Sequence, residues 1–192
     1  ISPIKKHEEL ALGVKKTEEK LGKAPEKLTG GTCYGYGFTT FSSLFTSRQF
    51  MTLCAFSDAI IDLKSEISPI NKEYSKTLIT YLSMALGRSA DYWSSISSWS
   101  NSRDGIRNTF GRQAIPMTWD FAEANPFSSS TGCWMNSIKW IERVIMNIPW
   151  VGIGEVEQKN IFDISPEQRD VVFCTDPPYY DNIAYADLSD YF

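Results

Sequence analysis

The sequence VVFCTDPPYYDNIAY, residues 171–185, decides the fold that we expect for this chain. It overlaps RDVVFCTD, residues 169–176, whose continuous apolar run is typical of a buried parallel strand. A second strand is expected in WVGIGEVEQ, residues 150–158. Helical periodicity and capping residues predict helices over 4–21, 44–67, 70–93 and 134–147. The expected fold class is therefore α/β, a mostly helical chain with a few parallel strands.

The residues that follow the last predicted strand have the chemistry needed to hold a planar amine. The Asp176 carboxylate can accept one N–H of an exocyclic amino group. Pro177 and Pro178 hold the turn rigid and leave their carbonyls free to accept the second N–H. Tyr179 offers a ring on which a base can stack, worth about 1–3 kcal/mol. Such a pocket suits a base swung out of its helix, whereas the alternative is an ordinary Asp-Pro turn with exposed tyrosines.

This strand followed by D-P-P-Y resembles the catalytic motif of the S-adenosylmethionine-dependent amino-methyltransferases, which act on adenine N6 or cytosine N4. TDPPYYDNIAYADLSDYF, residues 175–192, looks like one subgroup, the large prokaryotic adenine-specific DNA methylases that carry a zinc ribbon. Such enzymes often sit in restriction-modification or phage-defence gene clusters. The resemblance extends upstream through YGFTTFSSLFTSRQF, SSWSNSRDGIRNTFGRQAIPMTWDFAEANPF and GCWMNSIKWIERV, and covers about residues 34–192.

The resemblance implies a Rossmann-like fold and methyl transfer from S-adenosylmethionine to N6 of adenine in DNA. D-P-P-Y favours adenine over cytosine, for which Ser often replaces the Asp. The implied catalytic residues are Asp176, Pro177, Pro178 and Tyr179, and the implied substrate loop after them is Tyr180, Asp181 and Asn182. Two alternatives remain open: an amino-methyltransferase that acts on RNA or on a protein amide, and a non-catalytic nucleic-acid-binding module.

Two features of these enzymes are missing from the sequence. Their donor-binding loop is similar to D-x-F-x-G-x-G, and neither YGYGF at 34–38 nor VGIGEVE at 151–157 has the acid and the helix that such a loop needs. The zinc-ribbon cysteines are also missing. The chain begins with ISPIKK and no Met. We therefore expect an internal fragment of a longer polypeptide, inactive alone, with the donor loop upstream.

A weaker resemblance concerns the methyl donor itself. LFTSRQFMTL, residues 44–53, is similar to a helix start that packs near the methionine end of the donor in related enzymes, with Ser47 in place of a proline. It implies donor contacts for Thr46 and Arg48. The alternative is a core helix with an ordinary cap, because Thr46 and Gln49 fit the capping box.

A group of arginines predicts a nucleic-acid surface. Arg103, Arg107 and Arg112 lie close to Trp99 in a stretch rich in amide and aromatic side chains. Guanidiniums beside aromatic rings are typical of surfaces that bind phosphates and bases. The alternative is a solvated or salt-bridged loop, whose acidic partners would be Asp104, Asp120 and Glu123.

Composition limits the other possibilities. The net charge of −4 means that nucleic acid must be attracted by a local basic patch. The single His and the four widely spaced Cys argue against a Ser-His-Asp mechanism and a metal site, and favour reduced thiols in a cytoplasmic protein. No apolar run is long enough to suggest a membrane span. Three regions are expected: an N-terminal helix with a Gly-rich loop at 1–37, a helical region at 38–149, and a strand–loop segment with the motif at 150–192.

Overall fold

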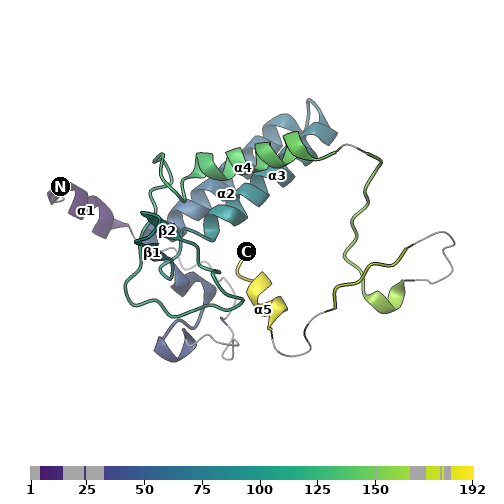
Figure 1. Ribbon diagram of the computed structural model, residues 1–192. Helices are drawn as coiled ribbons and strands as arrows, with labels where there is room; N and C mark the ends of the chain where they lie inside the picture. Colours follow the sequence, from purple (N-terminus) through teal and green to yellow (C-terminus); the bar gives the residue numbers. More distant parts are fainter. Residues whose placement is uncertain are drawn as a thin grey trace.

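The structure is a computed structural model that describes residues 5–14, 24, 33–149, 151–164, 172–177, 179 and 183–192. Helices dominate these residues, and three long ones lie side by side (Figure 1). The α-helices are α1 (Lys5–Gly13), α2 (Ser47–Ile67), α3 (Lys72–Ala90), α4 (Trp134–Asn147) and α5 (Tyr185–Ser189). The short 3-10 helices are η1 (Tyr34–Tyr36), η2 (Phe41–Leu44) and η3 (Ile161–Asp163). The strands are β1 (Ser98–Ser100) and β2 (Gly105–Arg107).

Side-chain caps start the two longest helices, and the one at Thr46 and Gln49 was predicted. The Thr46 hydroxyl accepts a hydrogen bond from the Gln49 backbone N–H at 3.2 Å, and the Gln49 side chain accepts one from the Thr46 N–H at 2.8 Å. This capping box satisfies N–H groups that the first turn of α2 leaves without a partner. Asn71 caps α3 in the same way, by accepting from the Tyr74 N–H at 3.0 Å. The predicted helices at 44–67, 70–93 and 134–147 are therefore confirmed, with ends shifted by at most a few residues.

Helix α3 packs between α2 and α4 and joins them into one helical layer. Small polar residues permit the close approach, since the hydroxyls of Ser89 and Ser137 meet at 3.0 Å between α3 and α4. At the end of α3 the buried Trp93 donates its indole N–H to the Gly132 carbonyl at 2.6 Å. The loop before α4 is thereby fixed to the end of α3.

The hydrophobic core lies where η2, the start of α2, the loops after α3 and the C-terminus meet. Leu44 and Ile115 are almost fully buried there. Tyr191, next to the C-terminal residue, stacks on Phe45 with a centroid distance of 5.4 Å and donates its hydroxyl to the Ala90 carbonyl at 2.9 Å. Burial raises the pKa of this hydroxyl above its ordinary value. We call residues 33–149 and 183–192 the helical body.

The prediction of parallel strands and of a Rossmann-like α/β fold is wrong for the part of the chain that the structure describes. The described strands form an antiparallel pair, with Ser98 opposite Arg107 and Ser100 opposite Gly105. Between them Asp104 adopts a positive φ of 44°, as a tight turn requires. Residues 151–158 and 172–176, the described parts of both predicted strands, have no strand structure and are exposed.

The physical reason for this error is the lack of a pairing partner. An extended segment becomes a strand only when a neighbouring strand takes up its N–H and C=O groups. None of the described residues does so for these segments, and Ile153 and Val172 are 97% and 92% exposed. We call the described residues of 151–179 the arm, whose first part extends away from α4 (Figure 1).

Among the described helices, none combines the length and the apolar character needed to cross a bilayer.

Candidate nucleic-acid interface

The predicted catalytic motif lies in the exposed arm. Asp176, Pro177 and Tyr179 are all exposed, with 64% of Tyr179 accessible to solvent. Pro178, Tyr180, Asp181 and Asn182, the rest of the predicted tetrad and substrate loop, lie outside the described residues. The described motif residues line none of the cavities of about 410, 670 and 1010 Å³ on the helical body. The motif therefore presents its carboxylate and ring to solvent.

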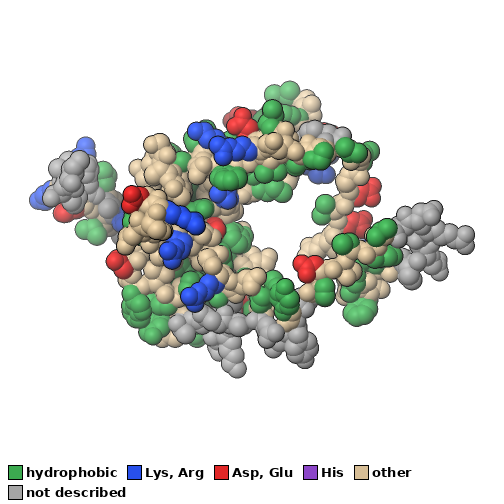
Figure 2. Space-filling model, in the orientation of Figure 1, with side chains coloured by type: hydrophobic (Ala, Val, Ile, Leu, Met, Phe, Trp, Pro, Cys, Tyr) green, Lys and Arg blue, Asp and Glu red, His purple; other side chains and the backbone are tan. Residues whose placement is uncertain are grey.

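The predicted arginine surface contains a polar cavity of about 410 Å³ beside the β1–β2 hairpin. Arg103 and Arg107 lie on its wall with side-chain hydroxyls and an amide, from Ser100, Ser102, Asn108 and Thr131. Guanidiniums and hydroxyls donate hydrogen bonds, so this cavity suits an anion rich in oxygen. Figure 2 shows Lys and Arg side chains gathered on the face over β1 and β2.

The Asp91 carboxylate binds the segment 108–110, which continues from the polar cavity. Its two oxygens accept from the Asn108 side-chain amide at 3.0 Å and from the Phe110 backbone N–H at 2.9 Å. The Asp91 carbonyl also accepts from the Thr109 N–H at 2.7 Å. Residues 108–110 are thus fixed to the C-terminal end of α3, and they support the neighbouring Arg107 and Arg112.

The arginines of this surface keep their charges available. Arg103, Arg107 and Arg112 are exposed and form no ion pair with any residue that the structure describes. Glu123, one of the three acidic partners expected for them, pairs instead with Arg48 through two hydrogen bonds of 2.7 and 3.0 Å. The described residues thus form no salt bridge with these arginines, which leaves the nucleic-acid surface and the solvated loop as the two interpretations.

The residues expected to contact the methyl donor, Thr46 and Arg48, form hydrogen bonds within the chain, and Arg48 does so on the surface. Thr46 caps α2, and hydrogen bonding to Glu123 raises the pKa of the Arg48 guanidinium above its ordinary value. YGYGF forms η1 and then turns at Gly37, which has a φ of 93°. VGIGEVE is exposed and no described helix follows it directly. Thr46 thus serves as the cap of α2, as in an ordinary capped core helix, and Arg48 as the partner of Glu123.

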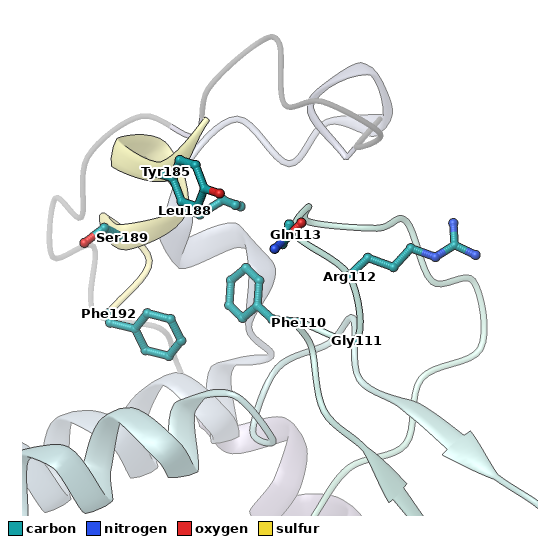
Figure 3. Close-up of a pocket in the computed structure, with 8 residues that line it drawn as sticks. All are labelled: Phe110, Gly111, Arg112, Gln113, Tyr185, Leu188, Ser189 and Phe192. Carbon is teal, nitrogen blue, oxygen red and sulfur yellow. The ribbon is translucent and has the colours of Figure 1, made fainter. Parts of the chain in front are cut away.

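An aromatic cavity of about 670 Å³ lies between residues 110–113 and α5 (Figure 3). The rings of Phe110 and Phe192 form one side of it, with centroids 5.4 Å apart. Gln113 points toward α5, whereas the side chain of Arg112 extends away from α5. The other lining residues are Gly111, Tyr185, Leu188 and Ser189. The cavity therefore combines apolar ring surfaces with one side-chain amide.

Tyr191 brings the two walls of the aromatic cavity together. Its ring meets Phe110 edge-on at 4.9 Å while it stacks on Phe45 from the core. The C-terminal residues, which follow the motif in the sequence, are thus packed against Phe110, between Arg107 and Arg112. Sequence reasoning missed Tyr185 and Phe192 as site residues, and the only available signal was the aromatic residues within YADLSDYF, residues 185–192.

Gly111 lines both the polar and the aromatic cavity, so the two adjoin at this residue. Trp99 lies on β1 opposite Ile106 and is 53% exposed. Trp119 is also exposed and makes an edge contact with Tyr36 at 4.8 Å. The surface around the arginines therefore offers both donors for anions and rings for stacking.

The described residues include no group of three or more His, Cys, Asp or Glu that could hold a metal ion. The four cysteines, Cys33, Cys54, Cys133 and Cys174, are all free, and Cys174 is exposed.

The described residues thus form a mainly helical protein with adjoining polar and aromatic cavities and an exposed arm that contains the Asp-Pro-Pro-Tyr sequence. No family model matches the chain, and neither a curated protein nor a solved structure is significantly similar to it. Conclusions about function therefore depend on the motif and on the chemistry of these surfaces.

Proposed function

We propose that this chain carries the target-base site of an enzyme that transfers a methyl group from S-adenosylmethionine to N6 of adenine in DNA. The observation that carries the proposal is the Asp-Pro-Pro-Tyr sequence, because its carboxylate and its aromatic ring are both exposed. A carboxylate and a proline carbonyl are acceptors for the two N–H groups of an adenine amine. An ordinary turn requires neither this acceptor pair nor a second proline.

Each motif residue has a separate task in this proposal. Asp176 accepts one amino proton and so fixes the direction of the nitrogen lone pair. Pro177 and Pro178 keep the turn rigid, and Tyr179 stacks on the flipped base. The arrangement needs no side chain with a pKa near neutrality, since positioning alone can lower a barrier by several kcal/mol. Tyr180, Asp181 and Asn182, which follow the tetrad in the sequence, would form the substrate loop after it.

The arginine surface supports DNA as the substrate. Phosphate contacts supply most of the sequence-independent affinity for DNA, and three exposed arginines without a described ion pair are suited to them. A protein that methylates chromosomal DNA works in the cytoplasm of a prokaryote, which is the location that we propose.

We place the donor-binding loop in another part of the full-length protein, because the residues described here do not form it. The chain's own contribution is to hold the base and its amino group. S-adenosylmethionine supplies the methyl group when it is bound.

The test is a methyl-incorporation assay with the full-length protein on adenine-containing DNA. Asp176→Asn keeps the shape of the side chain but weakens the acceptor, and should lower the rate about 100-fold or more. Asp163→Asn is the matched control, because Asp163 is also an exposed acid of the arm. A wild-type rate for Asp176→Asn, or equal losses in both variants, would refute the proposed role of Asp176.

A second candidate is a non-catalytic nucleic-acid-binding module. The unpaired arginines and adjoining cavities favour it, since binding at these surfaces needs no methyl donor. The two functions differ in one result: a module binds DNA but incorporates no methyl groups when the full-length protein is assayed.

A further inference from the structure

We propose that the two adjoining cavities form one nucleotide site, in which the polar cavity holds the sugar-phosphate and the aromatic cavity holds the attached base. The inference rests on the proposed function in one respect, that DNA supplies the nucleotide. It assigns a site for a nucleotide other than the target adenine, whose place is at Asp176.

The aromatic cavity fits a base by size and by surface. Its volume of about 670 Å³ exceeds what one planar base occupies, so a base can enter without displacing the core. Phe110 and Phe192 are tilted by 40° to each other, and Tyr185 on α5 is 44% exposed. Stacking on such rings is worth about 1–3 kcal/mol for each base and tolerates any sequence.

Gln113 gives this cavity one group that can contact the edge of a base. A side-chain amide has both donors and an acceptor, the combination that pairs with adenine. Gln113 is exposed, points toward α5 in Figure 3, and forms no hydrogen bond with a described residue. Its amide is therefore available to a ligand.

The polar cavity supplies what a phosphate requires. Arg103 and Arg107 are exposed on its wall, and a guanidinium can bind two phosphate oxygens at once. Asn108 is held by Asp91, so the floor of the cavity is fixed. Arg112 also lines the aromatic cavity, and its side chain extends away from α5 in Figure 3.

Gly111 is the connection between the two parts. A Cβ at this position would meet only the Asn108 carbonyl, at 4.0 Å, and its φ lies outside the left-handed region. A larger side chain is therefore compatible with the fold but would occupy the space between sugar and base. Gly35 has no atom within 4 Å of its Cβ position and lines neither cavity, so it provides a matched control.

The experiment uses the 192-residue chain and a single-stranded oligonucleotide that contains 2-aminopurine. The wild type should bind it and quench its fluorescence, because the probe stacks on the rings. Gly111→Leu and Gln113→Ala should each weaken binding about tenfold and reduce the quenching, whereas Gly35→Leu should bind as the wild type. Circular dichroism of each variant shows whether the fold is kept.

Wild-type affinity and quenching in both Gly111→Leu and Gln113→Ala would overturn the nucleotide site. Displacement of the oligonucleotide by an equal concentration of deoxyadenosine monophosphate would overturn a DNA strand as the source of the nucleotide. Neither result depends on methylation, so failure of this site is distinguishable from failure of the proposed function, which the Asp176→Asn assay decides.

Discussion

The helical body and the arm differ in where their apolar side chains lie, although both contain many of them. In the body, Leu44 and Ile115 are 0% and 1% exposed. In the arm, Ile153 and Val156 are 97% and 99% exposed. A helix satisfies its own backbone hydrogen bonds and needs only a surface to pack against, whereas an extended segment needs a neighbour for both backbone and side chains. Leu44 and Ile115 are thus buried because the body gives them surfaces to pack against, whereas Ile153 and Val156 have no such surface among the described residues.

The largest effect is expected from breaking the contact that attaches the C-terminus to the body. Tyr191→Ala removes a buried ring that packs on Phe45 and Phe110, and should lower the free energy of unfolding by about 3–5 kcal/mol. Tyr191→Phe keeps the ring and loses the hydrogen bonds of the hydroxyl, including the one that it donates to the Ala90 carbonyl, at a cost of about 1 kcal/mol. Urea denaturation measures both.

An exposed tyrosine of the arm is the control for this prediction. Tyr179→Ala should change the free energy of unfolding by less than about 0.5 kcal/mol. Equal losses for Tyr179→Ala and Tyr191→Ala would mean that the arm is packed as firmly as the body, which would contradict the comparison.

A smaller effect, on binding, tests whether the body rather than the arm supplies the affinity for DNA. Replacing Arg103, Arg107 and Arg112 together by Ala should weaken duplex binding and reduce the slope of log K against log salt by about 2 to 3. The physical reason is that each lost phosphate contact releases about one counterion fewer. Fluorescence anisotropy over a range of salt concentrations measures the slope.

A matched control removes three exposed lysines of α2 and α3 and so makes the same change in net charge: Lys64, Lys72 and Lys76, each replaced by Ala. The control should leave the slope nearly unchanged. If both triple variants flatten it equally, binding depends on overall charge and the arginine surface has no special role.

The smallest effect is expected in the arm itself. Ile153→Ser and Val156→Ser place hydroxyls on side chains that already face solvent, so each should alter the free energy of unfolding by less than about 0.5 kcal/mol. Differential scanning calorimetry of the 192-residue chain checks this. A loss above about 2 kcal/mol would show that these side chains are buried in solution.

The sequence predicted the parts of the fold that depend on neighbours along the chain. The Thr46–Gln49 capping box and the apolar spacing of α4 are local features, and the helices begin and end close to the expected residues. The strands predicted at 150–158 and 169–176 are wrong for the described residues of these ranges, because pairing depends on distant segments, which an apolar run does not specify.

The candidate site shows the same division. The arginines were predicted from composition, and the structure places them around one polar cavity and the loop beside it. The aromatic cavity was not predicted, because it exists only where Tyr191 packs the C-terminus against Phe110. No spacing rule connects these residues, so only the three-dimensional packing reveals their proximity.

The attachment of the C-terminus also limits how far apart two bound bases can be. Between Tyr179, where the target adenine would stack, and Tyr185, at the edge of the aromatic cavity, the chain spans at most about 20 Å when fully extended. A DNA strand advances about 3.4 Å for each nucleotide. In the proposed complex, a strand that runs directly from the motif to the aromatic cavity covers this distance with about six nucleotides, so the backbone between the two tyrosines sets how far apart along such a strand the two bases can lie.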